Sequence, residues 1–335
     1  MRKIAICFAL GLYASNAWTA EFMSVGTGTA KFNGLLQMWA LDDSTAGLDG
    51  NTNFRIRRAE LKFSGSVLEK TRWFLMVDPA KSLSTGVVSN ANDNKILQDF
   101  GMGFTLVEDL ELVAGQFKVP TAAEGLQSSS ELLFVERSYI ARTFGDRREP
   151  GLMLDYNPKP IRVRLMASNG QVSSGTTGSN INDTNNSKDI NARVDYSLSD
   201  ELKMGVFGSQ SHSIVGLSNR GGLNVHYTRE RLYVGVDGMQ GRELDAEKAG
   251  VAADVGYKFC DEMQAGFRYE NFQQKTAPES ANAYTLGLNY FLAGHNAKIQ
   301  LAHTVLNNML GTNGTISPSS SKNGTLTAFN FQMAL

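Results

Sequence analysis

The chain has 335 residues, its 32 Lys and Arg residues nearly balance 33 Asp and Glu residues, and its mean hydropathy is -0.22. This balance excludes a protein that binds nucleic acid through a strongly basic surface. A helical membrane protein is also excluded, because no run of about 18 or more apolar residues occurs. Low mean hydropathy still permits a transmembrane β-barrel, because residues that face lipid and lumen alternate along each strand.

The first residues have the pattern of a secretory signal peptide. Arg2 and Lys3 precede the apolar stretch 4–14, and the small residues Ser15 and Ala17 form a cleavage motif. The apolar stretch is too short to serve as a membrane anchor. We therefore predict a cleaved signal peptide at residues 1–17, a mature chain of residues 18–335, and export to the outer membrane of a Gram-negative cell.

Large or apolar side chains occupy every second position in many parts of the mature chain. The clearest runs are Ala59–Val67, Ile161–Ala167, Ile190–Leu198, Leu223–Tyr227, Val251–Phe259, Met263–Tyr269, Tyr284–Tyr290 and Phe329–Leu335. This alternation gives a strand one apolar and one polar face. A length of about 9–11 residues suits a tilted strand that crosses a bilayer. Aromatic residues near the predicted strand ends, among them Trp39, Trp73 and Tyr156, are expected at the membrane interfaces.

Short turns and long polar segments alternate between these strands. The short turns lie at residues 68–70, 108–109, 157–160, 199–200, 229–230, 260–262 and 294–296, and the long segments include 42–53, 168–189 and 307–324. Seven short turns define eight pairs of strands. The fold class is therefore all-β, with a sixteen-stranded antiparallel transmembrane β-barrel whose last strand pairs with its first. A soluble repeat protein is the alternative, but no blade motif recurs.

Residues between the lipid-facing positions are expected to face the lumen. The bases in this phase are Arg58, Lys62, Arg72, Arg162, Arg164, Arg193, Lys203, Lys258, Arg268 and Lys298, and the acids are Glu60, Asp78, Asp195, Asp237, Asp254 and Glu270. Ten bases against six acids predict a modestly positive wall that attracts anions. The same charges would select for nothing if they formed paired ladders across neighbouring strands, and the sequence leaves both interpretations open.

The connection at about residues 119–151 is much longer than the others. Within it, residues 129–141 have a helical pattern that places Leu132, Leu133, Tyr139 and Ile140 on one face. We expect this partly helical loop to fold inward and constrict the bore. The charged residues expected at the constriction include Glu124, Glu131, Glu136 and Arg137. The alternative is a loop that packs outside the barrel on a neighbouring subunit.

Three stretches carry more distinctive motifs: FRIRRAELKFSGSVLEKTRWFLMVDPA (54–80), LELVAGQFKVP (110–120) and SSSELLFVERSYIAR (128–142). They place a double Arg on the second strand, a Gly-Gln-Phe-Lys segment before the inward loop, and a Glu-Arg pair within that loop. In this order they resemble the phosphate-selective porin O and P family.

The resemblance implies a sixteen-stranded, usually trimeric outer-membrane barrel that passes small anions by passive diffusion. It also implies that Arg57 and Arg58 lie on the anion path and that Lys118 flanks the constriction. Selective members are expected to carry a dense inward ladder of Arg and a cluster of Lys, whereas acids such as Glu60 and Asp195 interleave with the bases here. We therefore predict a porin for small hydrophilic solutes with a modest preference for anions, phosphate among them.

Other classes of function have less support in the sequence. The four His residues, at positions 212, 226, 295 and 303, do not gather into a hydrolase site with a Ser and an orienting acid. No spacing suggests a metal site or a nucleotide-binding loop, so we predict no enzyme activity, metal or cofactor. The expected partners are outer-membrane lipid, small anions or other small solutes, and further copies of the chain in a homotrimer, without nucleic acid. A structural or adhesive barrel that passes no solute is the open alternative.

Overall fold

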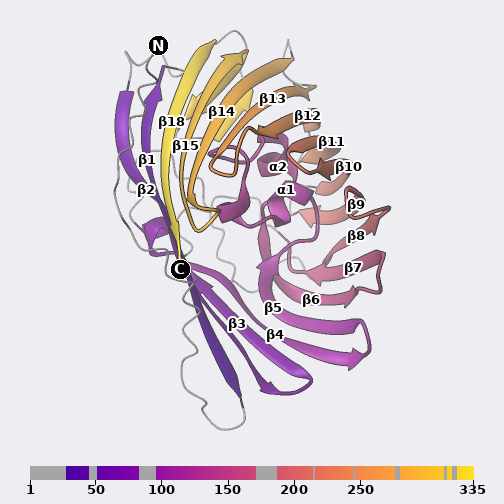
Figure 1. The fold of residues 1–335 in the computed structure, drawn as a ribbon. Helices are drawn as coiled ribbons and strands as arrows, with labels where there is room; N and C mark the ends of the chain where they lie inside the picture. Colours follow the sequence, from indigo (N-terminus) through magenta and orange to yellow (C-terminus); the bar gives the residue numbers. More distant parts are fainter. Residues whose placement is uncertain are drawn as a thin grey trace.

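The structure, a computed structural model, describes residues 28–44, 51–82, 96–170, 187–213, 216–243, 246–275, 280–312, 315–318 and 323–335. The predicted signal peptide and its cleavage site, at residues 1–17, lie outside these ranges. Sixteen antiparallel strands form one closed barrel (Figure 1). The predicted number of barrel strands and the predicted closure are therefore confirmed.

Each barrel strand pairs with its neighbours in the sequence, and the first strand pairs with the last. The barrel strands are β1 (Thr29–Asp43), β2 (Asn51–Leu68), β3 (Thr71–Val77), β4 (Leu97–Val107), β5 (Leu110–Lys118), β6 (Arg148–Tyr156), β7 (Ile161–Ser168), β8 (Asp189–Ser197), β9 (Leu202–Ser213), β10 (Gly216–Arg229), β11 (Leu232–Glu243), β12 (Ala246–Lys258), β13 (Met263–Gln274), β14 (Ala281–Ala293), β15 (Ala297–Asn307) and β18 (Gly324–Ala334). Two shorter strands, β16 (Met309–Thr312) and β17 (Thr315–Pro318), form a separate hairpin. This hairpin lies within the long polar segment at 307–324, and its pairing satisfies the backbone of part of that connection.

Pairing of β1 with β18 keeps the C-terminus in the sheet. Met38 lies opposite Phe331 in the register. Beyond it, the N–H of Gly34 donates to the carbonyl of Leu335 at 3.1 Å, and the N–H of Leu335 donates to the carbonyl of Gly34 at 2.8 Å. The strict alternation up to the last residue is thus the alternation of a paired strand without a free edge.

The two faces of the barrel differ as the alternation predicts. On β18, Phe329, Phe331 and Met333 are exposed on the outside, whereas Asn330 and Gln332 are buried in the interior. A lipid environment accounts for the exposed apolar face, because a closed barrel satisfies its backbone hydrogen bonds internally.

A β-bulge in β2 changes which residues face inward. Gln37 pairs with Arg58 and Met38 pairs with Ile56, so Arg57 is an extra residue in β2 without a partner in the β1 register. Both Arg57 and Arg58 consequently reach the interior, where their guanidinium groups contact the same carboxylate, as described below.

Trp39 lies in the interior rather than at a membrane interface. Its ring is only 1% exposed, and the guanidinium groups of Arg55 and Arg57 lie 4.7 Å and 5.1 Å from the ring centroid. This burial corrects the prediction that Trp39 belongs to an interfacial girdle. The physical reason is the register, because Trp39 pairs with the inward-facing Arg55.

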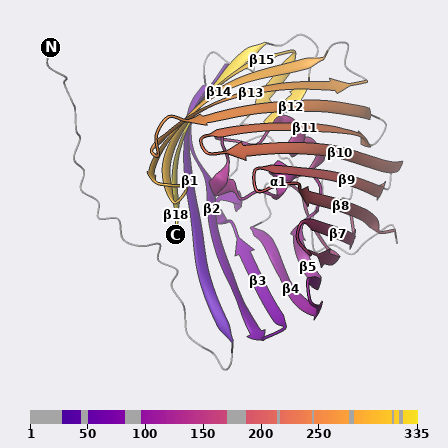
Figure 2. The same ribbon diagram turned by 45° about the vertical axis from the view of Figure 1, so that its right-hand side comes forward.

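The connection between β5 and β6, residues 119–147, folds into the barrel and is called the inner loop below. It contains the short helices α1 (Ala123–Leu126), η2 (Ser129–Glu131) and α2 (Tyr139–Phe144), and α1 lies within the ring of strands in Figure 2. Tyr139, Ile140 and Phe144 pack with Phe207 and Phe272 of the wall in one buried apolar cluster. The inward, partly helical loop is therefore as predicted. Among the described residues, no helix has the length and apolar character needed to cross a membrane.

The predicted helix at residues 129–141 is wrong for most of its length, because the chain between η2 and α2 is not helical. Side chains from five consecutive wall strands donate to backbone carbonyls in this segment. The hydrogen bonds join Gln37 to Ser129 (3.3 Å), Gln332 to Ser130 (3.0 Å), Lys298 to Leu132 (2.9 Å), Asn289 to Leu133 (2.9 Å) and Arg268 to Glu136 (3.2 Å). These five hydrogen bonds hold the segment along the wall, where it runs without the helix that the pattern predicts.

A charge on the outer face should destabilise the barrel. Leu288, near the middle of β14, is 49% exposed on that face. We expect Leu288→Arg to reduce the free energy of unfolding in lipid vesicles by about 2–4 kcal/mol, because the cation would enter hydrocarbon. The control Leu288→Phe keeps the face apolar. Equal stability of the Arg and Phe variants in denaturant titrations would contradict a lipid-facing position.

Candidate functional site: a basic cavity beside the inner loop

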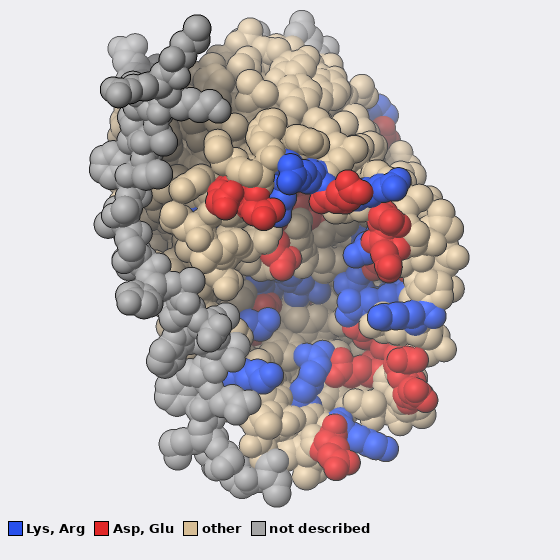
Figure 3. Space-filling view, viewed as in Figure 1, with Lys and Arg blue, Asp and Glu red and all other residues tan. Residues whose placement is uncertain are grey.

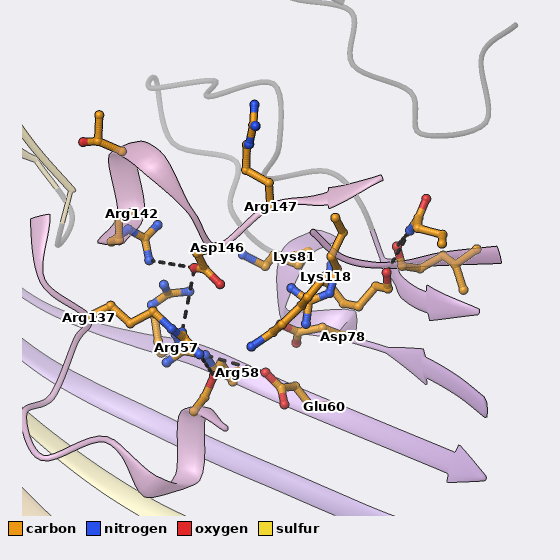
Figure 4. Close-up of a pocket in the computed structure, with 16 residues that line it drawn as sticks. Arg57, Arg58, Glu60, Asp78, Lys81, Lys118, Arg137, Arg142, Asp146 and Arg147 are labelled. Carbon is orange, nitrogen blue, oxygen red and sulfur yellow. Dashed lines mark hydrogen bonds and ion pairs between the residues drawn. The ribbon is translucent and has the colours of Figure 1, made fainter. Parts of the chain in front are cut away.

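A cavity of about 210 Å³ lies between the inner loop and the wall formed by β2–β5 (Figure 4). Residues from the wall, from the inner loop, from η1 (Pro79–Ser82) and from the start of β6 surround it. The lining residues are Arg57, Arg58, Glu60, Asp78, Lys81, Leu97, Gln98, Gln116, Lys118, Ser129, Arg137, Arg142, Thr143, Asp146, Arg147 and Arg148. The cavity thus brings together residues that are up to 91 positions apart, from Arg57 to Arg148.

Basic side chains dominate this lining. Eight of the sixteen residues are Lys or Arg and three are Asp or Glu, so the formal excess is five positive charges. Glu136, which contacts three of these arginines, contributes one further carboxylate beside the cavity. A partly desolvated space with a surplus of cations attracts anions more strongly than the same charges would in bulk water.

Glu136 ties the inner loop to β2. Its carboxylate lies 2.6 Å from Arg57 Nη2 and 3.3 Å from Arg58 Nη2, and Arg142 of the same loop approaches it at 3.3 Å. Burial alone would raise the pKa of Glu136, but the neighbouring guanidinium groups outweigh burial and hold this pKa well below its usual range. The carboxylate therefore stays ionised at neutral pH and joins the loop to the wall.

Asp146 has a similar place at the end of the inner loop. Figure 4 shows it between Arg137 and Arg142, whose Nη1 atoms lie 3.8 Å and 3.9 Å from its carboxylate. Burial opposes ionisation of Asp146, but Arg137, Arg142 and Lys118 lower its pKa by a larger amount. Asp146 therefore offsets part of the positive charge on the loop side of the cavity.

Two lysines complete the cavity. Lys118, at the end of β5, donates from Nζ to the carbonyls of Gly125 (2.7 Å) and Gln127 (3.0 Å), so it bridges the wall and the inner loop. Lys81 extends from η1, and burial together with the nearby Arg57 and Arg58 lowers its pKa to about 8. Sequence reasoning missed Asp146, and it also missed Lys81. Lys81 lies outside every alternating run, and only the return of the chain after β3 brings it to Arg57.

Elsewhere on the wall several arginines form ion pairs with carboxylates. Arg72 contacts Glu111 at 2.6 Å, and Arg162 contacts Asp155 at 2.6 Å. Arg164 and Arg193 share Asp195. The residues Arg162, Arg164, Arg193 and Lys203 line a second cavity of about 840 Å³ near the short turns. Figure 3 shows acidic and basic side chains mixed around a hollow of the barrel. Both sequence interpretations thus describe part of the wall: paired ladders in most places, and an excess of base beside the inner loop.

Two of the predicted anion-path residues lie beneath the inner loop. Arg268 is 3% exposed and binds Glu124 and Asp254 at 2.6 Å and 2.8 Å, and Lys298 is 1% exposed and donates to Leu132. This placement corrects their assignment to the bore, because the loop covers them and takes up their hydrogen bonds. They support the loop instead.

The remaining predicted residues are distributed over the interior. Lys62 is an exposed residue of β2 and lies on the same face of the strand as Glu60. Glu131 is exposed on η2, whereas Arg137 is buried and donates to the carbonyls of Glu124 (2.9 Å) and Gln127 (2.8 Å). Within the described ranges, no group of three or more His, Cys, Asp or Glu side chains could hold a metal ion.

Comparisons with known proteins place this geometry among porins. A family model described as phosphate-selective porin O and P matches residues 37–212. The fold is similar to that of an anion-selective porin from Comamonas acidovorans, with a TM-score of 0.68, 11% identity, and coverage of 92% of this chain and 100% of that chain. It is also similar to the outer membrane channel DcaP of Acinetobacter baumannii, with a TM-score of 0.66, 10% identity, and coverage of 94% and 100%.

A third similar structure is the trimer form of OmpT, an outer membrane protein of Vibrio cholerae. Its TM-score is 0.62 at 14% identity, with coverage of 91% of this chain and 99% of that chain. The sequence matches no curated protein. At these identities the solved structures establish the fold alone.

Removing the carboxylate of Glu136 should destabilise the protein. We expect Glu136→Ala to lower the free energy of unfolding by about 3–5 kcal/mol, because the buried guanidinium of Arg57 loses its carboxylate partner and that of Arg58 keeps only Gln37 and Glu60. Glu131→Ala, in the same loop at an exposed position, should cost about 0.5 kcal/mol or less. Denaturant titration in detergent micelles, followed by Trp fluorescence, compares the two. Similar losses for both variants would contradict the role of Glu136.

Proposed function

Because the chain belongs to the phosphate-selective porin O and P family, and is therefore a passive diffusion channel of the outer membrane, we propose that its basic cavity gives the channel a modest preference for small anions. The observation that carries this proposal is the surplus of basic side chains around the cavity, eight against three acidic ones. Its position beside the inner loop puts this charge where the interior is narrowed. Anions of phosphate size are within the class of solutes that such a surface attracts.

The mechanism requires no covalent chemistry. A solute moves down its own concentration gradient, and the channel selects by bore width and by the charge along the wall. Guanidinium and ammonium groups replace part of the water around an entering anion and repel a cation. Glu136, Asp146, Glu60 and Asp78 offset part of this field, which is why we propose a modest rather than a strict preference.

The second cavity should discriminate less. Its arginines share carboxylates with close partners, as in the pairs of Arg162 with Asp155 and of Arg164 with Asp195. A paired ladder leaves little net field for a passing ion. We therefore assign the selective step to the smaller cavity beside the inner loop.

The proposal extends to export and assembly. The signal peptide at residues 1–17 would direct the chain out of the cytoplasm and be removed. A homotrimer is supported by the family resemblance and by the trimer form of the similar OmpT from Vibrio cholerae. Chemical cross-linking of the purified protein tests the number of subunits.

Neutralising the double Arg should lower the anion preference. We expect Arg57→Gln/Arg58→Gln to shift the reversal potential toward cation preference in a planar bilayer under a KCl gradient. The reason is that two positive charges leave the cavity lining. Repeating the measurement with phosphate as the anion tests whether phosphate is preferred over chloride.

Two controls separate charge from loop position. Arg72→Gln removes one cation outside the cavity lining and should change the reversal potential much less. Glu136→Gln breaks the same contact between the loop and β2 but removes a negative charge, so it should increase the anion preference. If both the double Arg variant and Glu136→Gln shift the potential in the same direction, loop position rather than charge is responsible. A wild-type protein without conductance would overturn the channel itself and favour a structural barrel.

Anion preference should also fall at alkaline pH. The pKa of Lys81 is lowered to about 8, so this side chain is protonated below that pH and becomes neutral above it. We expect the anion preference to decline between about pH 7 and about pH 9, where arginines keep their charge. Lys81→Gln should have a smaller anion preference than the wild type at about pH 7, and that preference should fall less by about pH 9. Equal pH profiles for the wild type and this variant would exclude Lys81 from the field that an ion experiences.

A further inference from the structure

The wall beneath the tip of the inner loop contains glycine at three neighbouring inward positions. Gly256, Gly266 and Gly287 belong to the adjacent strands β12, β13 and β14. The apolar side chains of Leu133 and Phe134 occupy the space that side chains at these positions would fill. The wall is therefore hollowed where the loop is seated, and we call these residues the glycine seat.

The fit between loop and seat is tight. A Cβ atom at Gly287 would lie 2.9 Å from Phe134 Cδ1, and one at Gly266 would lie 3.1 Å from Phe134 Cζ. At Gly256 the nearest atom, Leu133 Cδ1, is also at 3.1 Å. Separations this short are below ordinary carbon–carbon contact, so a larger residue forces its neighbour to move.

Phe134 has little room to move within its own site. Its side chain is 3% exposed, and the guanidinium group of Arg268, which extends from β13, lies 4.4 Å from its ring centroid. Arg268 is itself held by Glu124 and Asp254. The ring is thus confined between the seat and a fixed guanidinium, and close packing transmits a displacement to the loop backbone.

The direction of that displacement follows from the order of the strands. In the closed ring of sixteen strands, β13 and β5 are eight places apart and lie on opposite sides of the barrel. The seat is on β12–β14, and the basic cavity lies along β2–β5. The inner loop lies between them, because Arg137, Arg142 and Asp146 on its other side line the cavity. A loop that rises from the seat therefore moves into the cavity.

We propose that Gly256, Gly266 and Gly287 are positioning residues that set the width of the channel. They let the inner loop lie deep against β12–β14 and so leave the space along β2–β5 open to solutes. This inference rests on the proposed channel function and adds to it the residues that determine the largest solute that passes. They act through Leu133 and Phe134 and touch no solute themselves.

The test is single-channel conductance of Gly287→Val in a planar bilayer, together with the size limit for neutral sugars in liposome swelling. We expect conductance to fall by about half or more, because current follows the open cross-section of the bore. The size limit should fall as well. Uncharged sugars separate bore width from wall charge, and only protein with the gel mobility of a folded barrel is used.

The matched control is Gly208→Val on β9. An added Cβ at Gly208 meets no atom within 4 Å, and the residue is exposed, so this variant should conduct like the wild type. Phe134→Ala in the Gly287→Val background removes the ring that the new methyl groups displace, and it should restore conductance and the size limit. A purely structural effect of valine would not be reversed by a second loss of packing.

Several results would overturn the inference. Folded Gly287→Val with the conductance and size limit of the wild type would do so, and so would an equal loss in Gly208→Val. If Gly287→Val does not fold, Gly287→Ala carries the same test, because its single methyl group already meets Phe134 Cδ1 at 2.9 Å. If the wild type conducts and Gly287→Ala conducts equally well, the role of the glycine seat is contradicted while the channel function stands. If the wild type itself does not conduct, the channel function is contradicted.

Discussion

The hydrogen bonds from wall side chains to the backbone carbonyls of the inner loop determine the interior of this protein. Donors on β1, β18, β15, β14 and β13 hold consecutive parts of residues 129–136 against the wall. Held in this way, the segment between η2 and α2 is not helical and runs along the inside of the wall from β1 to β13. The position of the loop then decides where space is left for a solute.

The charges of the barrel occur in two arrangements, paired on much of the wall and in surplus beside the inner loop. Over much of the wall, guanidinium groups share carboxylates at close range, as Arg72 does with Glu111, and such pairs contribute little net field. Beside the inner loop the bases outnumber the acids, and Glu136 joins the loop to Arg57 and Arg58. The proposed anion preference therefore rests on a local surplus of base, which the near-neutral composition of the whole chain conceals.

The interior is consequently asymmetric. On one side, small wall residues such as Gly266 and Gly287 receive the apolar side chains of the loop. Across the barrel, β5 presents Lys118 to the cavity, and β2, between the two regions, presents Arg58 to it. A loop that is tied to both sides, through Glu136 to β2 and through its carbonyls to β13–β15, keeps this division fixed.

The sequence by itself determined the barrel, the strand number and the inward loop, because alternation and turn positions are local properties that each strand carries on its own. It also indicated an excess of base in the lumen. Only the tertiary structure decided how that excess is distributed. Lys81 reaches the cavity through a chain reversal, and Arg57 turns inward through a β-bulge. Arg268 and Lys298, in phase with the lumen, are covered by a loop distant in sequence. These placements depend on contacts between remote segments, which no local pattern contains.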